Sequence, residues 1–225
     1  MKRWDALFWP AAALLLGTIA LFELTSLDLR LQDELYDFDA HRWMVDGTDA
    51  GPRFWFYDAP KIAIIGIGVL LIVLVCGPER WRRGIDRRAM LVAILTLASV
   101  PALVGVGKAT TNVFCPSEIR RYGGDVPYVQ LCGSYPAADR PLRKGRCFPA
   151  GHASGGFALI SLAGLARTAR GRWFGAAVGL MAGGTMGFYQ MAKGAHYLSH
   201  TLVTALVAWW MFLLWRRIIG VKSDT

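Results

Sequence analysis

Six long apolar runs, separated by short polar segments, dominate the chain. They lie near residues 5–26, 60–77, 87–107, 151–168, 172–191 and 198–219. Each is long enough, or nearly so, to cross the roughly 30 Å hydrocarbon core of a bilayer as a helix. Hydrophobic residues make up 54% of the chain, which exceeds the usual share in a soluble domain. The pattern predicts an all-α, polytopic membrane protein in which residues 1–225 form a single domain of six transmembrane helices.

The first run follows Met1-Lys2-Arg3, as the apolar part of a signal peptide would. No small-x-small cleavage site follows Leu21-Phe22-Glu23-Leu24, so we expect an uncleaved membrane anchor instead.

Basic residues gather in three segments that flank the apolar runs. They are Arg80, Arg82, Arg83, Arg87 and Arg88 after the second run, Arg167, Arg170 and Arg172 after the fourth, and Arg216, Arg217 and Lys222 in the tail. The positive-inside rule places these segments and both termini in the cytoplasm, so residues 27–59, 108–150 and 192–199 face outward. The net charge of +9 therefore indicates anionic lipid headgroups rather than nucleic acid as the partner.

The outward segment 27–59 is rich in carboxylates. Its apolar residues Leu31, Leu35, Phe38 and Trp43 predict an amphipathic helix on the membrane face. A cation site built from the carboxylates is an alternative use, although the ligand spacing of a known cation loop is missing. His41, in the same segment, is interpreted as a surface residue.

Glycines recur every four residues in the fifth run, at Gly175, Gly179, Gly183 and Gly187. This spacing produces a helix face that a neighbouring backbone can approach closely. We expect packing within the chain, and homodimerisation through the same face is the alternative.

Three of the four cysteines, Cys115, Cys132 and Cys147, lie in the outward loop 108–150. In an oxidising periplasm one disulfide among them is expected, with one thiol left over. The favoured pair is Cys115–Cys147, because each directly precedes a proline-containing segment expected at the site. Three unpaired thiols remain the alternative.

Histidines and lysines meet at the predicted outer face. His152 begins the fourth run, and Lys193, His196 and His200 have the three- and four-residue spacing of one helix face. Lys108 ends the third run at the same depth. Small residues at Gly151, Gly155 and Gly156 let an oxyanion approach backbone N–H groups at a helix start. Together these features predict a phosphate site; packing glycines and a zinc site of the three histidines are the alternatives.

At these residues the chain resembles the type 2 phosphatidic acid phosphatase superfamily, which includes bacterial membrane lipid phosphatases. The family's first motif, Lys followed by Arg-Pro, is similar to Lys108 with Cys115-Pro116. Its second, Pro-Ser-Gly-His, is similar to Pro149-Ala150-Gly151-His152. Its third, an Arg, a His and an Asp, is similar to Gln190, His196 and His200. The six-helix layout also matches.

The resemblance implies that His196 is the nucleophile, forming a phosphohistidine, and that His152 is the general acid, without a metal ion or cofactor. It also implies that Lys108, Ala150, Gly151, Lys193 and Gln190 surround the phosphate and that His200 orients His196. Four positions depart from the family pattern: Cys115 and Gln190 replace Arg, Ala150 replaces Ser and His200 replaces Asp. Lys193 restores one charge, and we expect a second from Arg120, Arg121, Arg143, Lys144 or Arg146.

The sequence therefore predicts a phosphatase of a bacterial inner (cytoplasmic) membrane that hydrolyses a lipid phosphate monoester or diphosphate at the outer face. A non-catalytic relative that binds a lipid headgroup and a lipid-to-lipid phosphotransferase are the alternatives. Undecaprenyl diphosphate, lipid A, phosphatidylglycerophosphate and phosphatidate all remain open as substrates, as does the oligomeric state.

Overall fold

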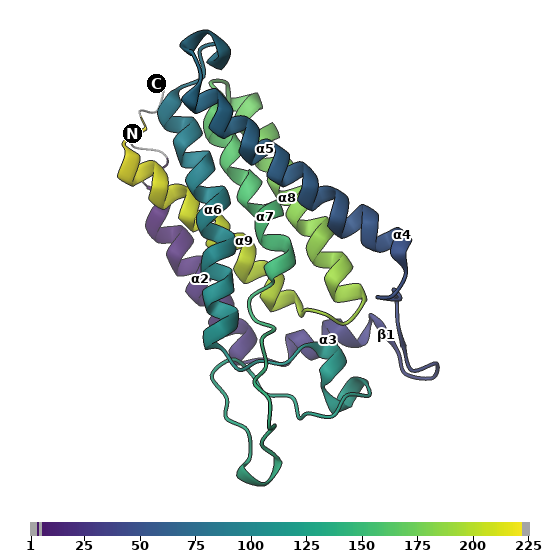
Figure 1. Ribbon diagram of the computed structural model, residues 1–225. Helices are drawn as coiled ribbons and strands as arrows, with labels where there is room; N and C mark the ends of the chain where they lie inside the picture. The colour runs from purple at the N-terminus through teal and green to yellow at the C-terminus, as the bar shows by residue number, and fades with distance from the viewer. Residues whose placement is uncertain (1–3, 5, 222–225) are drawn as a thin grey trace.

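The structure, a computed structural model, describes residue 4 and residues 6–221. Long helices run side by side in a bundle, with irregular segments gathered at one end (Figure 1). The main helices are α2 (Phe8–Glu23), α5 (Ala59–Cys76), α6 (Arg87–Thr110), α7 (Gly151–Ala158), α8 (Ala169–Ala192) and α9 (Leu198–Ile219). These elements agree closely with the six apolar runs, because each run is bounded by charged, Gly or Pro residues at which a helix can end.

Three helical segments of the described chain are long and apolar enough to cross a membrane: Ala50–Cys76, Arg87–Thr110 and Leu198–Ile219. A fourth is obtained if α2 and α3 (Leu27–Asp33), which meet at 72°, count as one span. The fourth apolar run becomes α7 followed by a 3-10 helix, η6 (Leu159–Leu165), and α8 contains charged residues in its first turn. The structure therefore has three or four candidate membrane spans, and the predicted six are not confirmed.

The basic segments converge at one end of the bundle, as the orientation argument requires. The Arg167 guanidinium donates to the carbonyl of Gly84, and Arg88 donates to that of Gly220 at 3.3 Å. Lys2, Arg3 and Lys222 lie outside the described residues. At the opposite end, Ser117 donates its backbone N–H to the carbonyl of Gly194 at 2.9 Å. This bond joins the turn after α8 to residues 108–150, which are termed the outward loop after their predicted orientation.

The glycine face of α8 packs against α7 and η6, as expected. A Cβ on Gly175 would lie 2.6 Å from the backbone of Ala163, and one on Gly179 would lie 2.2 Å from that of Ile160. A Cβ on Gly183 would meet the Phe157 ring at 2.3 Å. The stripe is therefore used within the chain, and the alternative of a dimer through this face is wrong.

The prediction of an amphipathic helix across the segment 27–59 is largely wrong. Helix α3 ends at Asp33, and the antiparallel strands β1 (Tyr36–Asp37) and β2 (Arg42–Trp43) follow. Helix α4 (Ala50–Arg53) and a π-helix, η1 (Phe54–Asp58), then lead into α5. The apolar residues form a hairpin because Trp43, Tyr36 and Tyr122 pack ring against ring, with centroids about 5 Å apart.

The remaining elements are short 3-10 turns. They are η2 (Glu79–Arg82) at the basic end and η3 (Pro116–Glu118), η4 (Arg120–Tyr122) and η5 (Ala137–Asp139) in the outward loop.

Candidate active site

Three histidines from three elements form a row. His152 is the second residue of α7, His196 lies in the turn between α8 and α9, and His200 lies in the first turn of α9. His152 Nδ1 lies 3.4 Å from His196 Nε2, and His200 Nδ1 lies 3.4 Å from His196 Nδ1. His196 therefore contacts one histidine with each of its ring nitrogens. Both contacts are satisfied when donation runs in one direction along the row, either from His152 through His196 to His200 or in the reverse order.

The expectation that Lys193, His196 and His200 share one helix face is wrong. Helix α8 ends at Ala192 and α9 begins at Leu198, so a turn separates Lys193 from His200. The turn depends on Gly194, whose φ is +73° and where a Cβ would lie 2.3 Å from the Trp43 ring. The two histidines nevertheless come together, because the turn brings His196 back over the start of α9.

Backbone hydrogen bonds hold this turn. The N–H groups of Ala195 and His196 donate to the carbonyl of Gln190, at 2.8 and 3.3 Å. At the start of α9, Asp28 accepts from the Ser199 backbone N–H at 2.9 Å and from the Ser199 hydroxyl. Gln190 occupies the position of the family arginine and is 1% exposed. It supports the turn through its backbone carbonyl.

The start of α7 carries the second motif. Ala150 occupies the N-cap position with an extended backbone and supplies no capping hydroxyl, and its N–H donates to the carbonyl of His200 at 3.3 Å. Lys108, in the last turn of α6, lies so close to Gly151 that a Cβ there would be 3.3 Å from Nζ. Glycine at residue 151 thus lets a cation lie beside the helix start, where backbone N–H groups already favour an anion.

Basic residues that were expected to replace the lost arginines are engaged elsewhere. Arg120 pairs with Asp139, Arg121 with Asp33 and Arg143 with Glu118 and Asp125. Lys144 donates to the carbonyls of Ala109 and Thr110, and Arg146 is exposed. The four residues with partners therefore stabilise the outward loop rather than the histidine row.

Lys61 supplies a charge that the sequence reasoning missed. It lies in the first turn of α5 and lines the same cavity as Lys108 and His152. The neighbouring Tyr57 contacts the His152 ring edge to face, with centroids 4.9 Å apart. The sequence did contain a signal for Lys61. It lies at the predicted outer end of an apolar run, the same kind of position that identified Lys108. Lys193 lies over the Tyr189 ring, with Nζ 4.8 Å from the centroid.

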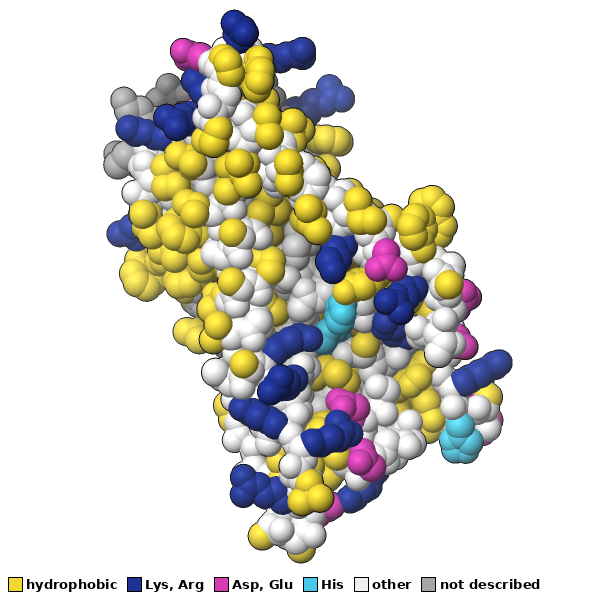
Figure 2. All heavy atoms as spheres, in the orientation of Figure 1, with side chains coloured by type: hydrophobic (Ala, Val, Ile, Leu, Met, Phe, Trp, Pro, Cys, Tyr) yellow, Lys and Arg dark blue, Asp and Glu magenta, His cyan; other side chains and the backbone are white. Residues whose placement is uncertain are grey.

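A cavity of about 580 Å³ opens between α5, α6 and α7. Its polar end holds Lys61, Lys108 and His152, and the rest is lined mainly by apolar side chains such as Ile72, Ile94 and Leu97. Figure 2 shows one face of the molecule, on which a histidine lies among Lys and Arg side chains below a wide hydrophobic surface. The cavity therefore has the polarity of a lipid with a charged head.

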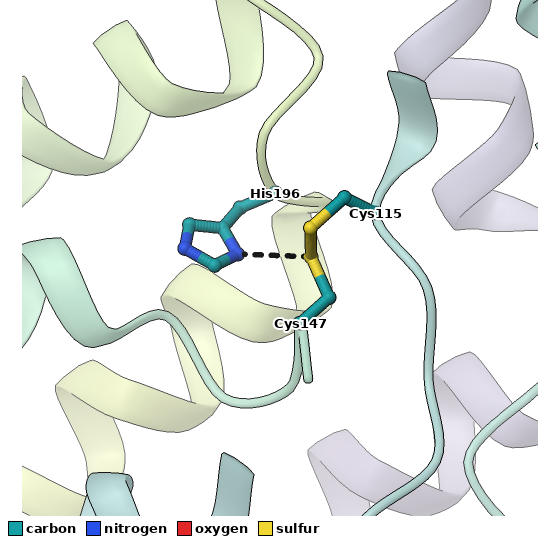
Figure 3. Close-up of side chains that lie close together, drawn as sticks. All are labelled: Cys115, Cys147 and His196. Atoms are coloured by element: carbon teal, nitrogen blue, oxygen red, sulfur yellow. Dashed lines mark hydrogen bonds between the residues drawn. A yellow bond between two sulfur atoms is a disulfide. The ribbon is translucent and has the colours of Figure 1, made fainter. Parts of the chain in front are cut away.

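Cys115 and Cys147 form the expected disulfide, and Cys76 and Cys132 are free and exposed. Cys147 Sγ lies 3.4 Å from His196 Nδ1 (Figure 3). In the described chain, Cys115, Cys147 and His196 are the group with metal-ligand spacing, but disulfide sulfurs are not thiolate ligands. The three histidines do not fit one zinc ion either, because His196 meets its two neighbours with different nitrogens.

His196 is 1% exposed. Burial, followed by the charges of His200, Lys108, His152 and Lys193, holds the pKa of His196 well below its usual value. A neutral imidazole is the form that attacks an electrophile, so the surroundings keep His196 nucleophilic at neutral pH.

A family model described as the PAP2 superfamily matches residues 89–224, more than half of the chain. This range contains all three motifs and the three histidines. The comparisons with curated proteins and with solved structures give no match.

Proposed function

We propose that this chain, which belongs to the PAP2 superfamily of type 2 phosphatidic acid phosphatases, hydrolyses a lipid phosphate monoester or diphosphate in a membrane. The family supports phosphatase chemistry on phosphate esters. The observation that supports a lipid substrate is the cavity, which is mainly apolar and ends at His152, Lys61 and Lys108. We place the site at the outer face of a bacterial inner membrane, with both termini in the cytoplasm.

In the proposed reaction, His196 Nε2 attacks phosphorus and the bond to the leaving oxygen breaks. His152 protonates that oxygen, and it then activates the water that hydrolyses the phosphohistidine. The His152 ring now contacts Nε2, so we expect it to rotate toward Tyr57 when a phosphate enters. Lys108, Lys61 and the N–H groups at the start of α7 stabilise charge on the phosphoryl oxygens, and Lys193 adds a positive potential.

Phosphate release from a panel of lipid phosphates and an isoprenyl diphosphate, measured in detergent, tests this function. His196→Ala and His152→Ala are expected to lower kcat by about a hundredfold or more, whereas His41→Ala, at an exposed site, is the matched control. Full activity in both site variants would refute the assignment. Phosphate found on an acceptor lipid would identify a phosphotransferase, and thermal stabilisation by vanadate without turnover would identify a headgroup-binding relative.

A further inference from the structure

The disulfide faces the nitrogen of His196 that is opposite the proposed nucleophilic one. Nδ1 lies 3.4 Å from Cys147 Sγ and 3.4 Å from His200 Nδ1, whereas Nε2 faces His152. Figure 3 shows the edge of the imidazole turned toward the sulfur pair. Cys147 is fully buried, so water does not compete for this contact.

The sulfur pair is tied to the turn that carries His196. Cys147 Sγ lies 3.0 Å from the carbonyl oxygen of Ala195, a packing contact because a disulfide sulfur carries no proton. Cys147 N–H donates to the carbonyl of Val113 at 2.9 Å, and Cys115 N–H donates to Glu118 at 2.8 Å. The disulfide therefore joins two segments of the outward loop directly beneath the turn.

This contact discriminates between the two neutral tautomers of His196. With the proton on Nδ1, that N–H meets the weak acceptor Sγ and the acceptor nitrogen of His200. With the proton on Nε2, the Nδ1 lone pair would face sulfur lone pairs and would need a donor, which only His200 Nδ1 could supply. A disulfide has none to offer. It thus favours the tautomer that leaves a lone pair on Nε2.

We propose that the Cys115–Cys147 disulfide is a positioning element for His196, which holds its ring and selects the tautomer with a free Nε2. It takes over part of the orienting role that the family gives to the Asp replaced here by His200. The inference rests on the proposed function, because it concerns the same site.

Reduction reverses this selection. A dithiol gives two electrons and two protons to the disulfide, forming the thiols of Cys115 and Cys147 and the oxidised dithiol. The Cys147 thiol can donate to Nδ1, or its proton can pass to the imidazole to give a thiolate–imidazolium pair. In both products Nε2 carries a proton and has no lone pair for attack.

The first test uses the full chain with Cys76→Ser and Cys132→Ser, so that only the disulfide responds. Dithiothreitol is expected to lower kcat about tenfold or more with little change in KM, and oxidised glutathione is expected to restore it. Cys115→Ala/Cys147→Ala in the same background should be slow and insensitive to both reagents. If the thermal stability of the reduced protein falls while its kcat is unchanged, the disulfide is structural only and the proposal is wrong.

The second test does not need turnover. The chain has four histidines, so ¹⁵N-histidine spectra in detergent can be assigned with His41→Gln, His152→Asn and His200→Asn variants. His196 is expected to carry its proton on Nδ1 alone in the oxidised protein and to carry a proton on Nε2 after reduction, either as the neutral Nε2–H form or as the imidazolium. The same tautomer in both states would overturn the proposal. If the wild-type protein cleaves no lipid phosphate, the proposed function fails, and these spectra still decide the role of the disulfide.

Discussion

His196 touches another ionisable ring with each nitrogen, so its charge state depends on its neighbours. Its pKa is well below the usual value of 6.5, first because of burial and then because of the His200 charge. A lowered pKa means that the neutral, nucleophilic form persists as the pH falls through 6.5. The acid limb of kcat/KM, where protonation of His196 stops the attack, is therefore expected below pH 6.5.

The change His200→Asp tests this dependence. A carboxylate beside Nδ1 stabilises the imidazolium, so it raises the pKa of His196 and is expected to move the acid limb to higher pH by about one unit or more. Profiles of kcat/KM between pH 4 and 9 measure the shift. His41→Asp, at an exposed position, is the control and should leave the profile unchanged. An unmoved limb in His200→Asp would show that His200 does not control the charge of His196.

Sequence spacing predicted which residues gather at the site but not which charges are available there. His152, His196 and Lys108 follow from the motifs, and their proximity was expected. Arg120, Arg121 and Arg143 were candidates for the second missing charge, yet each pairs with a carboxylate, in one case 88 residues away. Such pairing depends on how the outward loop folds, which no local pattern determines.

Helix α8 is positioned by the absence of side chains along one face. The four-residue glycine spacing predicted close packing, and Gly175 and Gly179 meet the backbone of η6, whereas Gly183 meets the Phe157 ring of α7 and Gly187 the Thr201 side chain of α9. What the sequence could not predict was that the fourth run would change from an α-helix to a 3-10 helix after Ala158. The 3-10 segment lies in close contact with α8, because Gly175 and Gly179 meet residues 159–163.

Gly179→Ala is expected to destabilise the protein by about 2 kcal/mol or more, because overpacking forces backbones apart. The added Cβ would lie 2.2 Å from the Ile160 backbone nitrogen. Gly184→Ala, on the same helix with no atom within 4 Å of its Cβ, is the matched control and should be neutral or slightly stabilising. Thermal unfolding in detergent measures the difference. Equal melting temperatures would mean that α8 does not depend on this contact.

At the scale of the whole molecule, the bundle has a basic end, a histidine site towards the other end and an apolar cavity that ends at His152. Gly66 and Gly68 both lie on α5 with open space at their Cβ, but only Gly68 lines the cavity. Gly68→Phe is therefore expected to raise KM for a long-chain lipid phosphate about tenfold, the cost of losing one or two kcal/mol of apolar contact. The KM for a short-chain phosphate should change little, and Gly66→Phe should leave the KM of both substrates unchanged. Equal effects of Gly68→Phe on long and short chains would argue against a lipid tail in this cavity.

The orientation of the bundle can be read from the two free thiols of the native chain. Cys76 ends α5 at the basic end, and Cys132 lies in the outward loop; both are exposed. If the basic end is cytoplasmic, a membrane-impermeant maleimide added to intact bacterial spheroplasts should label Cys132 and reach Cys76 only after lysis. Cys76→Ser and Cys132→Ser variants identify each signal. Labelling of Cys76 before lysis would place the basic end outside and the histidine row in the cytoplasm, where a reducing environment would also keep the Cys115–Cys147 pair from forming.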